Sequence, residues 1–363
     1  SIGGRGRKVL GMPVFAWGVA AAMTIAAIGG VLFVQDVRTG PMRGDFNIAV
    51  ARFTAVDEKG TPQVTDESLN LADSVYQRID SELQALNEQG FGFEVRAPEM
   101  TGTISGETKD ARGESAERLA QDIQADVVIF GALSEQAFTP EFFIHKRKDH
   151  FQNAEELTGQ FELGSAIMRS KLVAGSITSN MQLRKAMAER INALVQFVIG
   201  LSWYASHHFE QAQKAFNHAL AIEGWKDSDG KEVLHLFVAN TAGKLKDLDT
   251  ASRVFQHVME LNPQYARGLL GAAEVGYLQA SGGCKPASAN AEGLRRAADR
   301  YRQALAAELQ PAMSNVDAKA ALGLGRVYAC LSQALIDDLW REAEAAFRQV
   351  TDAYQAGNQA IRA

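Results

Sequence analysis

The feature that most constrains the fold of this 363-residue chain is a long uncharged run near its amino end. No Asp, Glu, Lys or Arg occurs between Lys8 and Asp36, and residues 9–34 read VLGMPVFAWGVAAAMTIAAIGGVLFV. About 20 apolar residues in a helix, rising ~1.5 Å each, cross the hydrocarbon layer of a bilayer. We therefore expect a transmembrane helix over residues 10–34, with the lipid bilayer as its partner, and a cytoplasmic basic flank over residues 1–9.

Two other structures fit this run less well. A cleaved signal peptide has a shorter apolar core of ~7–15 residues and ends in a small-residue cleavage site. A buried helix of a soluble protein usually has a polar face. Because Arg5, Arg7 and Lys8 precede the run, we expect the amino terminus in the cytoplasm and the bulk of the chain outside it, at the cell membrane.

Small residues recur at every fourth position of the run, and this spacing lets a second membrane helix approach closely. Chance is the alternative in so alanine-rich a segment. The expected helix-pairing positions are Gly18, Ala22, Ala26 and Gly30.

Composition excludes several classes of function. The chain is 46% apolar and 22% charged, as in globular proteins. A net charge of −6 without a concentrated Lys/Arg surface argues against a nucleic-acid partner. The two cysteines, Cys284 and Cys330, have no zinc-binding spacing. Outside the cytoplasm a disulfide between them is chemically permitted, and a small buried thiol is the alternative for Cys330.

After an expected linker over residues 35–45, strand and helix patterns alternate. Strand patterns at 46–53, 93–95 and 126–133 are separated by amphipathic helical patterns at 65–87 and 114–125. This order predicts a small βαβαβ sheet, with antiparallel edge strands at 142–144 and 157–163. We expect this α/β domain to span 46–172 and a connecting helix to span 173–192.

Two motifs in this region carry a resemblance. The strand Ile-Ala-Val-x-x-Phe begins at Ile48, and the helix-strand unit Ala-x-x-Leu-Ala-x-x-Ile-x-Ala-Asp-Val-Val-Ile-x-Gly begins at Ala116. Their order resembles the extracytoplasmic α/β domain related to the TolB amino-terminal domain. In similar bacterial proteins, tetratricopeptide repeats often follow that domain. The motifs contain no catalytic residue, so the resemblance implies a fold and no activity.

Helix-pair patterns repeat through residues 193–363. The first copy has Ile199-Gly200, Trp203, Ala212, Phe216 and Ala219 at the offsets of the ~34-residue tetratricopeptide repeat, which it resembles. Three further copies follow, with insertions in the third and the fourth. Their marker residues are Val238-Ala239, Ala251, Phe255, Val258 and Pro263; Ala297, Tyr301 and Ala304; and Leu324-Gly325, Tyr328, Ala343 and Phe347. We expect a solenoid of about four helix pairs, more than the ~3 needed for a continuous core.

The resemblance implies a concave surface that binds other proteins. A clamp for a peptide carboxylate is not expected, because Phe197 and Leu201 stand where Lys and Asn would be needed. The alternative is that the apolar positions pack against the preceding helix or the α/β domain. The expected partner-binding residues are Leu194, Phe197, Leu201, Tyr204, Leu236, Asn240 and Lys244.

No catalytic motif is found. The seven histidines include no HExxH pair, Gly323-Leu324-Gly325 lacks the third glycine of a dinucleotide loop, and no phosphate-binding loop or nucleophile elbow occurs. The loop over 101–113 lies at the sheet edge where α/β proteins bind ligands, although solvated charges are the ordinary alternative. We expect no enzyme activity, no catalytic residue, no cofactor and no metal.

The predicted fold class is α+β overall, with a single transmembrane helix, a small α/β (βαβαβ) domain and an all-α tetratricopeptide solenoid. The predicted function is a single-pass bacterial membrane protein whose extracytoplasmic region is a scaffold for protein partners. Whether the protein forms a homo-oligomer or joins a larger membrane complex is left open by the sequence. Because the chain begins with Ser1, the alternative is the sensor portion of a receptor whose cytoplasmic effector lies upstream.

Overall fold

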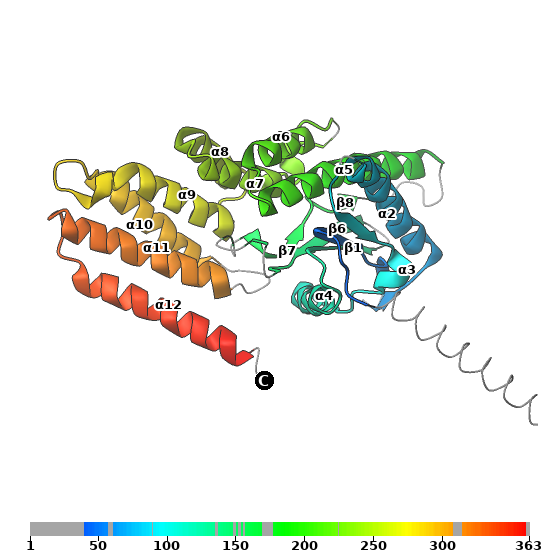
Figure 1. Cartoon of the computed structure of the whole chain (residues 1–363), viewed down its shortest axis with the longest axis horizontal. Coiled ribbons are helices and arrows are strands. Elements are labelled where there is room, and N and C mark those ends of the chain that lie inside the picture. Colours follow the sequence, from blue (N-terminus) through cyan, green and yellow to red (C-terminus); the bar gives the residue numbers. More distant parts are fainter. Residues whose placement is uncertain are drawn as a thin grey trace, which may run out of the picture. The chain divides into compact units, whose positions relative to one another are not determined.

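The fold is that of a computed structural model of the chain (Figure 1). The structure describes residues 40–56, 61–88, 90–134, 137–147, 150–151, 154, 157–168, 177–223, 225–307 and 314–360. The chain divides into two compact units, residues 1–42 and residues 43–363. The sheet and the helical repeats therefore belong to one unit, and the following concerns that unit.

The fold class expected from the sequence is wrong in its transmembrane helix. Among the residues that the structure describes, no helix has the length and hydropathy to cross a bilayer. The longest of these helices, α5 (Ile177–Ala205), carries the charged side chains of Lys185, Glu189 and Arg190, and such charges are costly in hydrocarbon. The expected span at residues 10–34 lies outside the described residues. So do the expected helix-pairing positions Gly18, Ala22, Ala26 and Gly30.

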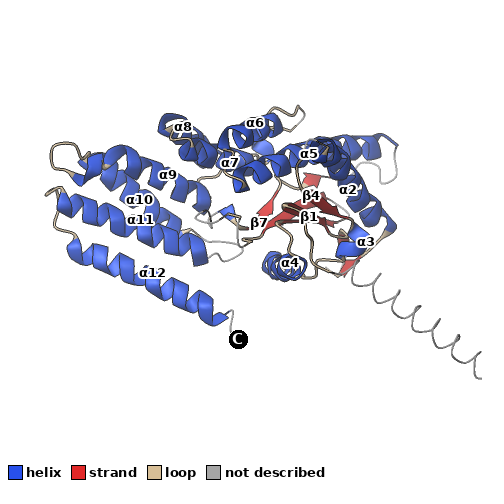
Figure 2. Ribbon diagram, in the orientation of Figure 1, coloured by secondary structure: helices blue, strands red, loops and turns tan. Residues whose placement is uncertain are grey.

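A mixed sheet forms the amino-terminal part of the unit (Figure 2). Strand β1 (Phe46–Val50) lies between β4 (Phe93–Arg96) and β5 (Val127–Leu133), parallel to both. On the other side of β5, β6 (Ala137–Ile144) runs antiparallel and pairs with β7 (Gly159–Glu162). Three short strands extend the sheet: β2 (Thr54–Val56), β3 (Pro62–Gln63) and β8 (Ile167–Met168).

Two helices cover the two faces of this sheet (Figure 1). Helix α2 (Asp66–Asn87) begins with a reciprocal cap, in which Thr65 Oγ1 accepts from the Ser68 N–H at 3.2 Å. It buries a stripe against the face of β1 that carries Ile48. Helix α4 (Lys109–Ile123) covers the opposite face, and the short α3 (Pro98–Thr101) follows β4. Because side chains alternate along a strand, β1 serves both layers and is buried throughout.

The remaining helices form antiparallel pairs joined by turns. They are α5 (Ile177–Ala205) with α6 (Phe209–Leu220), α7 (Glu232–Lys244) with α8 (Leu248–Leu261), α9 (Ala266–Ala280) with α10 (Ala291–Ala306), and α11 (Ser314–Gln333) with α12 (Trp340–Ala360). One-turn helices η2 (Asp227–Asp229) and η3 (Gly282–Cys284) lie in two of the connections.

Glycine contacts show how the first and fourth pairs close. A Cβ on Gly200 would lie 2.4 Å from Phe216 Cε1, and a Cβ on Gly325 would lie 2.6 Å from Phe347 Cε1. Only a residue without a side chain allows the ring of the second helix to pack so close to the first. The same contact in the first and fourth pairs confirms the expected tetratricopeptide repeat region.

One aromatic cluster joins the sheet to the first two helix pairs. Phe142 of β6 stacks on Phe161 of β7 at 5.1 Å between ring centroids. Phe197 of α5 contacts Phe142 at 5.1 Å and Phe237 of α7 at 4.9 Å. These rings are all buried, so α5 and α7 lie against the sheet and share its core.

A disulfide joins Cys284 in η3 to Cys330 on α11. Their Cα atoms are 4.9 Å apart, and the link closes 46 residues of sequence. It connects the inserted loop of the third repeat to the first helix of the fourth.

Candidate functional site

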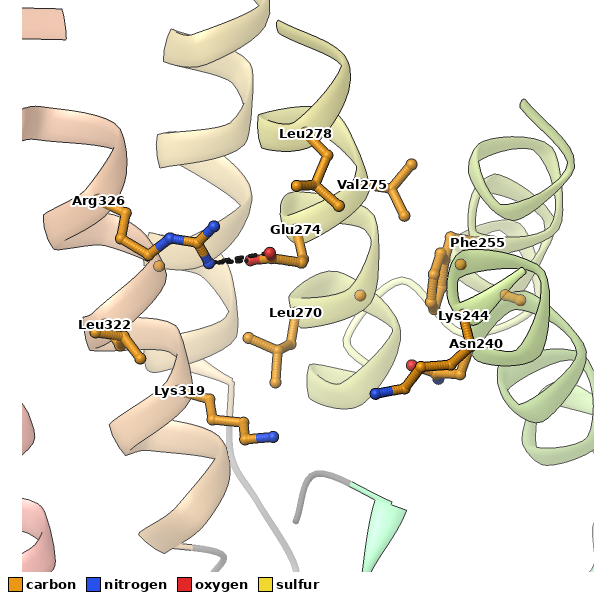
Figure 3. A pocket seen from close by; sticks show the side chains of 14 residues that line it. Asn240, Lys244, Phe255, Leu270, Glu274, Val275, Leu278, Lys319, Leu322 and Arg326 are labelled. Carbon is orange, nitrogen blue, oxygen red and sulfur yellow. Dashed lines mark hydrogen bonds and ion pairs between the residues drawn. The ribbon is translucent and has the colours of Figure 1, made fainter. Parts of the chain in front are cut away.

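A groove of about 350 Å³ opens between the repeat helices α7, α9 and α11, with α8 behind it (Figure 3). Its floor is apolar: Phe255, Leu270 and Val275 are buried there. Leu278 and Leu322, in contrast, remain 45% and 41% exposed. Small residues allow the helix backbones to form its walls: Ala239, Gly243, Gly271 and Gly323.

Cationic side chains approach the groove from two helices. Lys244 lies on α7, four residues after Asn240 and therefore on the same face. Lys319 and Arg326 lie on α11, across the floor from α7 (Figure 3). Glu274 is the anion among the lining residues. Three cations therefore face a single carboxylate, and the groove has an excess of positive charge.

A polar network holds Glu274 in place. Arg326 Nη1 lies 3.0 Å from both carboxylate oxygens of Glu274, and the Tyr301 hydroxyl donates to Oε2 at 2.6 Å. Burial raises the pKa of Tyr301, and the adjacent charge of Glu274 raises it further, so the phenol stays protonated as a donor. Burial lowers the pKa of Arg326, but the charge and hydrogen bond of Glu274, together with Tyr277 and Tyr301, raise it above its ordinary value. The network pairs Glu274 with Arg326, and Lys244 and Lys319 add two positive charges to the lining residues.

Two of the residues expected to bind a partner lie in the groove. The Lys244 side chain is exposed, and Asn240 donates from Nδ2 to the Leu236 carbonyl at 2.9 Å. The prediction that the other five bind a partner is wrong, because each is at most 4% exposed and lies in the core. These five are Leu194, Phe197, Leu201, Tyr204 and Leu236.

The physical reason is the position of α5 against the sheet. Phe197 meets Phe142 of β6, and the ring of Tyr204 stacks on Phe151 at 6.5 Å. The sheet occupies the surface that a first repeat would otherwise leave open. The groove begins one repeat later.

Sequence reasoning missed the α9 and α11 contributions. The frame that placed Leu194, Phe197 and Leu201 on the first repeat was not carried to the fourth. In the fourth repeat, the residues six and three positions before Gly325 and one position after it are Lys319, Leu322 and Arg326. The signal was therefore present in the repeat pattern itself.

Two charged residues of the segment 101–113 form ion pairs that hold the structure together. Arg112 forms an ion pair with the buried Glu141 of β6 at 2.6 Å, and Gln160 of β7 donates to the same carboxylate. Lys109 pairs with Glu162 of β7 at 2.8 Å. These contacts attach α4 to the sheet edge.

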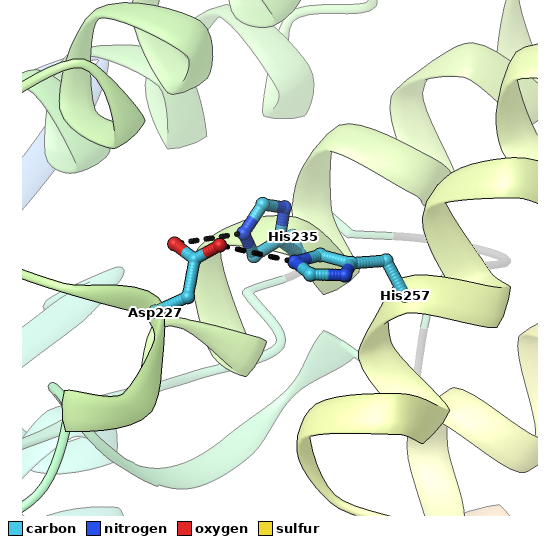
Figure 4. Close-up of side chains that lie close together, drawn as sticks. All are labelled: Asp227, His235 and His257. Carbon is cyan, nitrogen blue, oxygen red and sulfur yellow. Dashed lines mark hydrogen bonds and ion pairs between the residues drawn. The ribbon is translucent and has the colours of Figure 1, made fainter.

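The structure also brings three potential metal ligands together, where the sequence suggested none. Asp227, His235 and His257 come from three separate elements (Figure 4). No short motif contains them, because the chain folds back between α7 and α8 before they meet. The expectation of no metal stays a prediction, but it did not foresee this meeting of three possible ligands.

Comparisons with known proteins find only remote structural similarities. No protein-family model matches the sequence, and no curated protein matches it. Two structures of MamA are similar to the chain at 14% and 12% identity, with TM-scores of 0.34 and 0.35. The matches cover 51% and 52% of this chain, and 84% and 99% of MamA.

A third similar structure is a thermophilic tetratricopeptide-repeat protein of Thermus thermophilus. It is 19% identical with a TM-score of 0.35, over 44% of this chain and 74% of that protein. At such values the likeness carries no functional argument. The tetratricopeptide interpretation rests on the helix pairs and their glycine contacts.

Proposed function

We propose that the described part of the chain is a non-enzymatic protein-interaction scaffold whose groove binds an extended acidic segment of another protein. The observation that carries this proposal is the combination in one groove of an apolar floor and lysines on opposite walls, Lys244 and Lys319. A segment that alternates apolar and acidic side chains matches both features.

The two kinds of contact would contribute differently. Leu278 and Leu322 are large, exposed apolar side chains at the same groove, and burying them supplies affinity at about 25 cal/mol per Å². An exposed Lys–carboxylate pair adds only ~0.2–1 kcal/mol, but opposite charge raises the association rate and selects partners. The leucines would thus provide binding energy, and the lysines the preference for acidic segments.

The proposal is tested with two fluorescein-labelled peptides and the full 363-residue chain. One peptide alternates Leu and Glu, and the other has Gln in place of every Glu. Anisotropy titrations should show tighter binding of the Glu peptide and weaker binding as salt is raised. The double substitution Lys244→Glu with Lys319→Glu should lower that affinity by about tenfold or more, at ~1.4 kcal/mol per factor of ten.

The matched control is Lys214→Glu, the same charge change at an exposed position of α6 outside the groove. It should leave the affinity unchanged. Equal binding of the two peptides, or an equal loss in the control variant, would contradict a cationic peptide groove.

We also propose that this region works outside the cytoplasm. The disulfide between Cys284 and Cys330 supports this location, because such bonds persist in oxidising compartments and are rare in reducing ones.

A further inference from the structure

Three side chains from separate elements converge beside the second helix pair (Figure 4). Asp227 lies in η2, His235 near the start of α7 and His257 on α8. His257 Nε2 is 3.1 Å from Asp227 Oδ2, and His235 Nε2 is 3.6 Å from Asp227 Oδ1. One nitrogen or oxygen from each residue lies within 4.8 Å of the other two. The two imidazole rings are 4.7 Å apart and nearly perpendicular.

These separations suit a single small cation. Zinc binds histidine nitrogen at ~2.0–2.1 Å and carboxylate oxygen at ~2.0–2.2 Å, so two ligands of a tetrahedral site lie about 3.3–3.5 Å apart. The two histidine nitrogens lie 3.1 and 3.6 Å from the two different oxygens of Asp227, which is close to that separation, and one ligand atom from each residue lies within 4.8 Å of the others. An ion between the three groups would draw their ligand atoms together and would keep a fourth position open.

The surroundings of the histidines support the same conclusion. His257 Nδ1 lies 3.6 Å from Glu260 Oε2, and a metal-binding histidine typically directs its second nitrogen to a carboxylate, which fixes the ligating one. His235 Nε2 is buried, and its partner Asp227 Oδ1 lies 3.6 Å away, just beyond hydrogen-bond distance. A cation between the imidazole and the carboxylate would give this buried nitrogen a closer partner.

We propose that Asp227, His235 and His257 form a binding site for a divalent transition-metal ion of the zinc class. Two imidazoles and a carboxylate favour zinc, cobalt, nickel or copper over magnesium and calcium, which prefer oxygen ligands alone. The neighbouring cation Lys231 donates to the Leu220 carbonyl at 2.7 Å, so its ammonium is held by that oxygen.

Such an ion would fasten η2 to α7 and α8. The same turn already accepts three hydrogen bonds at the Asp229 carbonyl, from Ser165 N at 2.8 Å, Trp225 Nε1 at 3.0 Å and Arg190 Nη2 at 3.3 Å. Ser165 follows β7, so η2 links the sheet to the repeats. Metal binding would therefore stabilise the junction between them.

The test is a titration of the untagged full chain with Co²⁺, a spectroscopic substitute for Zn²⁺. The protein should develop the intense visible bands of tetrahedral cobalt at one equivalent, and Zn²⁺ but not Mg²⁺ should abolish them. His257→Ala and Asp227→Ala should each weaken binding by more than about 100-fold, and Glu260→Gln by about 10–100-fold. The matched control His218→Ala removes an exposed histidine of α6 and should bind as the unaltered chain does.

Circular dichroism of each metal-free variant establishes that it is folded. If His257→Ala unfolds, Asp227→Ala decides the matter, since Asp227 lies on an exposed turn. Absence of the cobalt bands in the folded, unaltered chain would overturn the proposal. Bands that persist in a folded Asp227→Ala or His257→Ala variant, or that depend equally on His218, would overturn it as well.

Discussion

Replacing Phe197 with alanine tests whether the first repeat helix belongs to the core or to a binding surface. Its ring is 0% exposed and lies 5.1, 5.6 and 4.9 Å from the rings of Phe142, Phe216 and Phe237. Truncating such a buried phenylalanine costs about 3–5 kcal/mol of unfolding free energy. The same substitution on an open binding face would change the free energy of unfolding by no more than about 0.5 kcal/mol. Urea unfolding followed by circular dichroism measures the difference.

Two further variants sharpen this experiment. Leu322→Ala removes a groove leucine that is 41% exposed, and it should change stability far less than Phe197→Ala. A double-mutant cycle with Phe142→Ala should give a coupling of about 0.5–1.5 kcal/mol, because the two rings pack together across the junction. A loss below about 1 kcal/mol for Phe197→Ala, or zero coupling to Phe142, would refute a core shared by sheet and repeats.

Three other predictions concern single contacts. Gly200→Ala would place a Cβ 2.4 Å from Phe216 and should cost about 1–3 kcal/mol in thermal unfolding, whereas Gly243→Ala, with no atom within 4 Å, should be harmless. Cys284→Ala should lower the free energy of unfolding by about 4 kcal/mol, because it releases the loop that the disulfide closes. Peptide mapping that finds two free thiols in the native protein would exclude this bond. Burial lowers the pKa of His145, so the folded state binds its proton less readily than the unfolded state. This difference stabilises the folded state above the ordinary pKa of 6.5, and the stabilisation is lost as pH falls below that value. Urea titrations at several pH values should show the free energy of unfolding falling by at most ~1.4 kcal/mol per pH unit. His145→Gln should remove this contribution to the slope.

The local elements could be predicted because their signals lie in adjacent residues. The β-branched residues from Ile48 mark β1, and Thr65 with Ser68 marks the start of α2. The pairing of Gly200 with Phe216 is equally local, since it joins two helices across one turn. For such features, the spacing in the sequence determines which residues meet.

The long-range arrangement could not be predicted in the same way. An apolar stripe on α5 fits a groove and a core equally well, and only the position of the sheet decides that Leu194 and Phe197 are buried. The meeting of Asp227 with His257 likewise depends on how α8 folds back on η2. Both outcomes come from tertiary packing, which the period of one helix does not contain.

The central claim is that the groove between α7, α9 and α11 receives the partner segment. Hydrogen–deuterium exchange of the full chain, with and without the alternating Leu/Glu peptide, tests this claim most directly. Exchange should slow around Asn240, Leu278 and Leu322, the groove residues of α7, α9 and α11, and stay unchanged in α6. Protection confined to α6 or α12, or no protection at all with the peptide bound, would contradict it.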